Sequence, residues 1–327
     1  MVFLFRDKSV INILFLIILS IGVHFHFLIS EPLLITNNND GYISLILQQY
    51  FSKLDTSFLF IIYILSLLIQ AVRFNLLLNE LKMFQQSAYT VGMTYILLSG
   101  FATAWCTISS VLFANFLLIW LFTKMLNMYN HPNPKSLIFN IGLIVGISII
   151  GYHPIALMLL VILFALGIMR SFKIQEWVIL LLGLIIPYYF LGAYLFFNNQ
   201  LNSFTNYLPH FQLVIPSVQL NTSFSISIIV LGIAFLAGLF YWQQYNSRLV
   251  IQIRKNWATV LVMCIVLFSA PFFFKQGGIQ SVFLCLVPLA AMVSNAFSFP
   301  KRFILPNLLF LMMIIVVVYN NWQLIKN

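Results

Sequence analysis

Residues 223–243, SFSISIIVLGIAFLAGLFYWQ, form an apolar stretch without a single charged side chain. About 20 apolar residues are enough for a helix to cross the hydrocarbon core of a bilayer. The composition of the whole 327-residue chain agrees with this stretch, because 62% of the residues are hydrophobic and only 7% are charged. Soluble domains carry about 25% charged residues. The sequence therefore predicts an integral membrane protein.

Apolar segments of similar character recur along the chain and leave no room for a soluble domain. In lipid a helix satisfies its own backbone donors and acceptors, so these segments are predicted to be helical. The expected fold is all-α: one transmembrane domain over residues 1–327, a polytopic bundle of about eleven spans. The predicted spans are 10–30, 57–73, 87–103, 107–124, 137–151, 154–170, 177–197, 223–243, 257–274, 280–298 and 303–320.

The first of these segments resembles a signal peptide, because MVFLFRDKSV precedes an apolar run. A cleavage site needs small residues after that run. Residues 24–27, HFHF, occupy that place instead. We therefore expect an uncleaved first span.

The basic residues predict the orientation. Cytoplasmic loops of membrane proteins are enriched in Lys and Arg. With the N-terminus placed in the cytoplasm, thirteen of the sixteen Lys and Arg residues fall in inner loops, and only Lys53, Lys275 and Lys326 fall outside. The net charge of +10 is thus explained by topology, and no basic cluster indicates nucleic acid as a partner. The expected location is a bacterial inner membrane.

The sequence contains few residues that could form a metal, redox or proton-binding site. Cys106, Cys264 and Cys285 lie in apolar segments at spacings that match no zinc or redox motif, so no disulfide, metal site or cofactor is predicted. Glu80 and Glu176 fall at inner span ends beside basic residues, which they are expected to neutralise. No Asp or Glu lies within a predicted span, which disfavours a proton- or sodium-coupled transporter.

Two sizeable loops are predicted on the outer side, 31–56 and 198–222. In the first, residues 41–53 read as a short amphipathic helix on the membrane surface, preceded by a turn at Asn37–Asp40. Asp40 has two readings: a turn or N-cap residue, or a general base held over a cavity that faces the membrane.

Other outer-side residues could bind a phosphate. His153 precedes Pro154 at the tip between two spans, and Lys275 lies near a Gly-Gly pair. Both side chains can donate to phosphate oxygens, as can His210 in the second outer loop. The alternative for His153 is a solvated turn residue. His24 and His26 are two positions apart and do not share a helical face.

This layout resembles the GT-C membrane glycosyltransferases, in which the Asp of the first outer loop is the general base and the donor is a polyprenyl-phosphate sugar. Asp40, in DGYISLILQQY, takes the place of that Asp, and Tyr42 follows it as a Tyr does in many members. The segment 146–177, GISIIGYHPIALMLLVILFALGIMRSFKIQEW, is similar to a stretch in mannosyltransferase-like members where a basic residue and Pro open a span. His stands here at that basic position. The whole sequence also resembles an uncharacterised Bacteroidota family of integral membrane proteins.

The resemblance implies glycosyl transfer on the periplasmic face, with Asp40 as base and with His153, Lys275, His210 and Tyr42 binding substrate. The alternative is a non-enzymatic inner-membrane subunit, scaffold or lipid-handling transporter, because ionisable residues are scarce on the outer side. The expected partners are membrane lipids, a polyprenyl-phosphate sugar and, in the alternative, another membrane protein.

Overall fold

The computed structural model describes residues 2–7, 9–30, 32–37, 40–129, 131–216, 222–274 and 277–326. The prediction of an all-α chain is confirmed. Within the described residues the only strands are β1 (Leu34–Ile35) and β2 (Ile108–Ser109), which pair in parallel and tie the first loop to the segment before α6. The long helices are α4 (Thr56–Glu80), α7 (Pro134–Gly151), α9 (Ile174–Phe197), α10 (Thr222–Asn246), α11 (Ile251–Phe268) and α14 (Ile304–Lys326). The shorter ones are α1 (Val2–Arg6), α2 (Ile11–Val23), α3 (Tyr42–Tyr50), α5 (Thr90–Ser99), α6 (Ser110–Leu126), α8 (Met158–Met169), α12 (Ala270–Phe273) and α13 (Leu286–Ser298). The 3₁₀ segments are η1 (Phe25–Leu28), η2 (Phe51–Lys53), η3 (Thr103–Trp105), η4 (His153–Leu157), η5 (Leu201–Tyr207) and η6 (Gly278–Cys285).

Seven helices are long and apolar enough to cross a membrane: α4, α7, α9, α10, α11, η6 with α13, and α14. Four shorter apolar helices, namely α2, α5, α6 and η4 with α8, occupy the remaining predicted spans. The protein is thus a multi-helix membrane bundle. The count of about eleven spans stays a prediction, because the four shorter helices fall below the length that a full crossing needs.

The bundle has a buried centre, and its outer surface exposes large apolar side chains. The segment Gly278–Ser298 is the most enclosed of the seven long apolar helices, with 89% of its most apolar stretch buried, and every residue of the shorter α5 is buried as well. By contrast, α9 leaves large apolar side chains such as Leu181 and Tyr189 exposed. Apolar exposure on this scale is expected of a surface that faces acyl chains.

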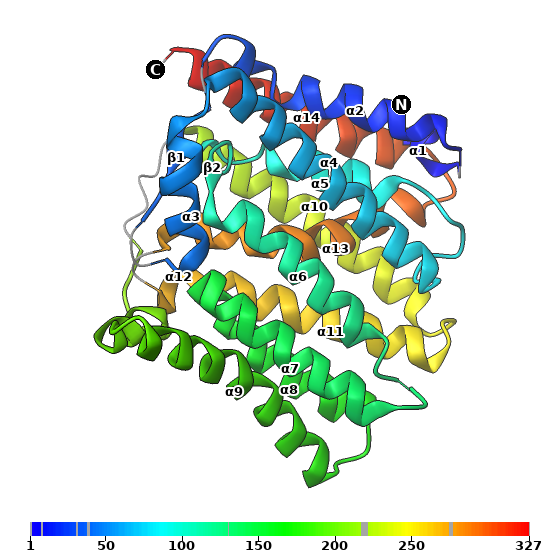
Figure 1. The fold of residues 1–327 in the computed structure, drawn as a ribbon. Coiled ribbons are helices and arrows are strands. Elements are labelled where there is room, and N and C mark those ends of the chain that lie inside the picture. The colour runs from blue at the N-terminus through cyan, green and yellow to red at the C-terminus, as the bar shows by residue number, and fades with distance from the viewer. Residues whose placement is uncertain are drawn as a thin grey trace.

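Glycines allow α7 and α9 to pack closely. A Cβ placed on Gly142 would lie 2.5 Å from the carbonyl oxygen of Leu180 and 3.0 Å from the Cα of Gly183. Small residues let transmembrane helix backbones approach in this way. This contact holds α7, which ends at the candidate site, against its neighbour (Figure 1).

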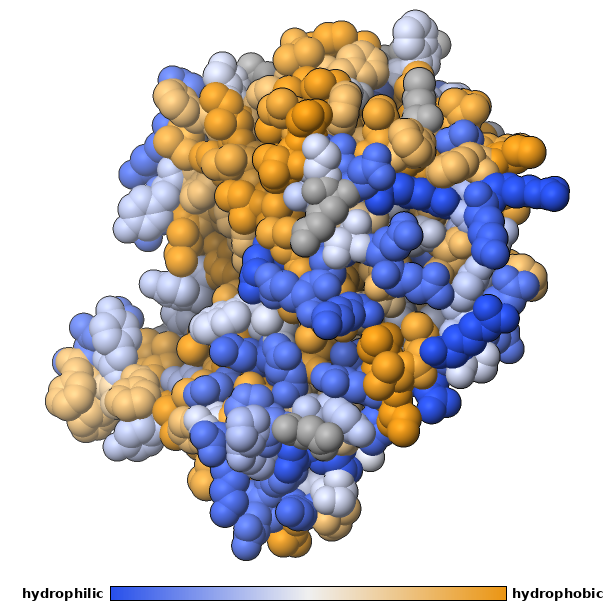
Figure 2. Space-filling model, turned by 90° about the vertical axis from the view of Figure 1, so that its right-hand side faces the viewer, coloured by the Kyte–Doolittle hydropathy of each residue, from blue (hydrophilic) through white to orange (hydrophobic). Residues whose placement is uncertain are grey.

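One end of the bundle carries α1 and the turns next to it, and we call it the basic face. Contacts join its turns: the ring of Phe84 lies against those of Trp257 and Phe299, and Arg6 lies over the ring of Phe303. Figure 2 shows hydrophilic side chains gathered across this end. Its placement in the cytoplasm stays a prediction.

Two ion pairs on this face agree with the predicted role of its carboxylates. Arg170 Nε donates to Glu176 Oε2 at 2.9 Å, and Arg73 lies 3.4 Å from Glu80. The Arg170 pair is largely buried, whereas the Arg73 pair is exposed and contributes little to stability.

The opposite end, which we call the loop face, carries β1, β2, α3, η4, η5 and α12 (Figure 1). Both loops predicted to lie outside are at this end. The candidate site is therefore separated from the basic face by the length of the bundle.

Candidate functional site

The segment 37–44 forms the turn that positions Asp40. The Asp40 N–H donates to the Asn37 carbonyl at 3.1 Å, and the Ser44 hydroxyl donates to the same oxygen at 2.6 Å. The predicted turn is therefore present, and the predicted surface helix follows it as α3 and η2.

The N-cap reading of Asp40 is wrong. Gly41 is the N-cap residue of α3, and no side chain caps this helix end. Gly41 takes this position with φ of 123°, a conformation that side chains disfavour. The Asp40 carboxylate therefore does not cap α3.

The turn docks onto the tip between α7 and η4. The His153 N–H donates to the Asp40 carbonyl at 3.0 Å. A Cβ on Gly41 would overlap the carbonyl oxygen of Gly151 and lie 2.8 Å from its carbonyl carbon, so only glycine fits there. Two predicted site residues, 113 positions apart in sequence, are thus neighbours.

The Asp40 carboxylate is buried, with 6% of the residue exposed. Its Oδ2 accepts a hydrogen bond from Asn37 Nδ2 at 3.0 Å, while Oδ1 is buried without a hydrogen-bond partner in the described structure. Burial raises the pKa of Asp40 from 3.8 to about 6, and the Asn37 hydrogen bond opposes that rise. A carboxyl group with a pKa near neutrality and one oxygen without a hydrogen-bond partner is suited to accepting a proton.

Tyr152 and His153 line the same tip, and both are buried. The solvated-turn reading of His153 is therefore wrong, since 3% of the residue is exposed. Burial and the nearby charge of Asp40 both raise the pKa of the Tyr152 hydroxyl. Sequence reasoning placed Asn37 in the turn before α3 but did not predict its side-chain hydrogen bond to Asp40. It missed Tyr152, whose place beside Asp40 depends on contact between segments far apart in the chain.

The turn before η6 closes on this tip. A Cβ on Gly277 would lie 3.2 Å from the Tyr152 hydroxyl and 3.3 Å from Pro154 Cγ. Lys275 itself lies outside the described residues, so its predicted phosphate-binding role stays a prediction.

The second outer loop contacts α3 through Tyr42. The rings of Tyr42 and Tyr207 have centroids 6.4 Å apart, and half of Tyr42 is exposed. Beyond η5, Gln212 N donates to the Phe273 carbonyl at 2.9 Å, so the loop crosses toward α12. His210 is exposed and makes no hydrogen bond within the described chain. The structure does not join it to Asp40 and His153.

A separate buried polar network lies near the loop-face ends of α2, α4 and α5. His24 Nε2 lies 3.2 Å from the Tyr63 hydroxyl, which donates to the Trp105 carbonyl at 3.1 Å. His26 is hydrogen-bonded to Asn321 of α14. The two imidazole centroids are 6.2 Å apart, and no group of three or more metal-ligating side chains is found among the residues described. The network ties helices together.

No protein-family model matches this chain, and no curated protein matches it in sequence. The resemblance to the GT-C enzymes therefore stays a prediction, and the site has to be argued from its own geometry.

Proposed function

We propose that the protein is a GT-C-like glycosyltransferase of a bacterial inner membrane, which takes its sugar from a polyprenyl-phosphate donor at the loop face. In this proposal the loop face is periplasmic and the N-terminus is cytoplasmic. Asp40 is the general base. The acceptor is a hydroxyl group.

The observation that carries the proposal is the buried Oδ1 atom of Asp40, which has no hydrogen-bond partner among the described residues. The acceptor oxygen attacks the anomeric carbon, a new C–O bond forms, and the bond from that carbon to the phosphate oxygen breaks. Polyprenyl phosphate leaves with the bonding electrons, and the acceptor proton moves to Asp40 Oδ1. A base with a pKa of about 6 is ionised at neutral pH and still basic enough to help this transfer.

Other residues of the loop face are given supporting roles. His153, held beside Asp40 by its backbone hydrogen bond, and Lys275 donate to the donor phosphate. Half-exposed Tyr42 offers an aromatic face to a sugar ring, and exposed His210 binds the donor phosphate. The exposed apolar surface of the bundle gives the polyprenyl chain a path through lipid.

The test uses membranes that contain the full chain, a panel of radiolabelled polyprenyl-phosphate sugars and a lipid-linked acceptor pool. Asp40→Asn keeps the shape of the side chain and removes its basicity, so we expect transfer to fall by roughly a hundredfold or more. Asp55→Asn is the matched control, because Asp55 is an exposed carboxylate of the same loop. Wild-type activity is expected to rise with pH through about 6 and then level off, since the base must be ionised.

Transfer that is unchanged in Asp40→Asn would sink the proposal. The non-enzymatic alternative, a membrane subunit, scaffold or lipid-handling transporter, would then be preferred. Copurification of a stoichiometric membrane protein would be the next measurement.

A further inference from the structure

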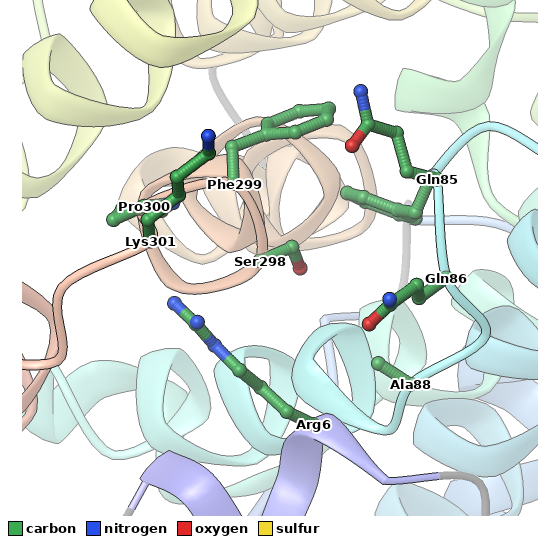
Figure 3. A pocket seen from close by; sticks show the side chains of 9 residues that line it. Arg6, Gln85, Gln86, Ala88, Ser298, Phe299, Pro300 and Lys301 are labelled. Atoms are coloured by element: carbon green, nitrogen blue, oxygen red, sulfur yellow. The ribbon is translucent and has the colours of Figure 1, made fainter.

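A cavity of about 260 Å³ opens at the basic face, between α1, the turn that precedes α5 and the turn that follows α13. Its polar lining comes from Arg6, Gln85, Gln86, Ser298 and Lys301, and no carboxylate lines it. In Figure 3 the side chains of Arg6, Gln86 and Ser298 extend into one shared space. Two cations and several neutral donors thus face a space without a negative charge.

Arg6 is fixed in place but only partly satisfied. Its Nε donates to the Phe297 carbonyl at 2.7 Å, and its guanidinium lies over the ring of Phe303 at 4.5 Å. Nη2 is buried and has no hydrogen-bond partner among the residues that the structure describes. The ion pairs found among the described residues, Arg73 with Glu80 and Arg170 with Glu176, do not involve it.

Arg6 is partly buried and has no ion-pair partner among the described residues, which makes its charged form less stable than in water. Desolvation by burial lowers the pKa of Arg6, which means that the charged form lacks the stabilisation that water would give. An anion with hydrogen-bonding oxygens would offset this loss of hydration. The cavity beside Arg6 is the place where such an anion fits.

The size and the position of the cavity narrow the class of anion. A volume of about 260 Å³ is below the range of roughly 300–1,000 Å³ for sites that hold drug-sized ligands, so a small polar group is favoured. Arg forms paired hydrogen bonds with phosphate oxygens. Basic pockets between transmembrane helices bind the head groups of anionic lipids. Phe3 and Leu4, exposed on α1 near Arg6, place an apolar surface next to the cavity.

We infer that this cavity binds a phosphate group, supplied by a free phosphate anion or by the head group of an anionic membrane lipid. Arg6 supplies the paired donors and Lys301 adds a second positive charge at the rim. Ser298 and Gln86 complete the hydrogen bonding. The cavity lies at the other end of the bundle from Asp40, so the inference does not depend on the transferase proposal.

The experiment uses the full chain, purified in a zwitterionic detergent. Titration calorimetry with inorganic phosphate, against chloride at equal ionic strength, measures the free anion. Native mass spectrometry from nanodiscs of phosphatidylcholine with added phosphatidylglycerol measures the retained anionic lipid. Signal in the first arm alone assigns a soluble phosphate, and signal in the second arm alone assigns a lipid. Either result supports the site, and no binding in both arms overturns it.

The variants locate the binding. Arg6→Gln is expected to weaken binding about tenfold or more, because a charge-assisted pair of hydrogen bonds is lost. Lys301→Gln is expected to weaken it several-fold. Arg248→Gln is the control, since it removes one exposed positive charge of the chain outside the cavity. An equal loss in Arg248→Gln would reduce the effect to general charge and overturn the inference. If Arg6→Gln does not fold, the test is binding by Lys301→Gln, because Lys301 is exposed and its substitution should not disturb folding. Unchanged binding in Lys301→Gln then overturns the inference.

Discussion

The backbone N–H of His153 donates a hydrogen bond of 3.0 Å to the backbone carbonyl of Asp40. This bond fixes the first outer loop to the tip between α7 and η4, whatever the side chains do. The relative position of the two segments is therefore set in part by backbone atoms.

Gly41→Ala should disrupt this docking. The new Cβ would meet the Gly151 carbonyl, and alanine would have to adopt a φ of 123°. Strain of this kind costs about 1–3 kcal/mol before any clash is counted. We expect a lower unfolding temperature in detergent and faster cleavage of the 31–56 loop by an added protease.

Gly232→Ala is the control for that experiment, because a Cβ on Gly232 in α10 would meet nothing within 4 Å. It should be neutral or slightly stabilising, since alanine is the better helix former. Equal stability of the two variants would contradict the docking of the loop.

Asp40→Asn should stabilise the protein at neutral pH while it removes the proposed base. The folded-state pKa of about 6 lies above the ordinary value of 3.8, so the folded state binds more protons between these values. Stability then falls as the pH rises from about 4 through about 6, and the loss is complete above that. A rise of this size corresponds to about 2–3 kcal/mol at pH 7.5.

The asparagine variant does not ionise, so its advantage should appear at pH 7.5 and fade toward pH 4. Thermal unfolding at both pH values measures it. Asp55→Asn, with its carboxylate exposed on the same loop, should show no such pH-dependent gain. A variant less stable than wild type at pH 7.5 would mean that the Asp40 charge is compensated in the folded protein.

Hydropathy alone predicted the positions of the helices well, since each long or short apolar helix falls on a predicted span. Helical spacing likewise placed α3 between Gly41 and Lys53. The contacts of the Asp40 turn with residues 151–153 could not be predicted in the same way. The contact of Gly41 with Gly151 depends on the approach of two backbone segments far apart in sequence, and no sequence pattern around either glycine predicts that contact.

Tyr63→Phe tests the buried network on the loop side of the bundle. The hydroxyl of Tyr63 joins His24 to the Trp105 carbonyl, so its removal leaves buried groups with fewer partners. Hydrogen bonds between membrane helices are worth about 1–2 kcal/mol at most. We expect a destabilisation of that size in a reversible unfolding assay, such as one in mixed detergents.

Tyr189→Phe is the matched control, because 70% of Tyr189 is exposed on α9. It should change stability by less than about 0.5 kcal/mol. If both variants behaved alike, the network would not contribute to the fold.

The orientation of the chain is open to a direct measurement with two serines. Ser52, in η2, lies at the loop face, and Ser136, in the first turn of α7, lies at the other end of the bundle; both are exposed. Three predicted spans separate them, so they should lie on opposite sides of the membrane. The native cysteines are buried and should give little background.

A membrane-impermeant maleimide applied to intact cells should label Ser52→Cys, and it should label Ser136→Cys only after the cells are opened. The bias of Lys and Arg toward inner loops is the physical reason. The reverse pattern would invert the orientation, place Asp40 in the cytoplasm and remove the periplasmic transferase proposal. Labelling of both positions in intact cells would show instead that one of α4, α5 and α6 does not cross, and short α5 would be the first candidate.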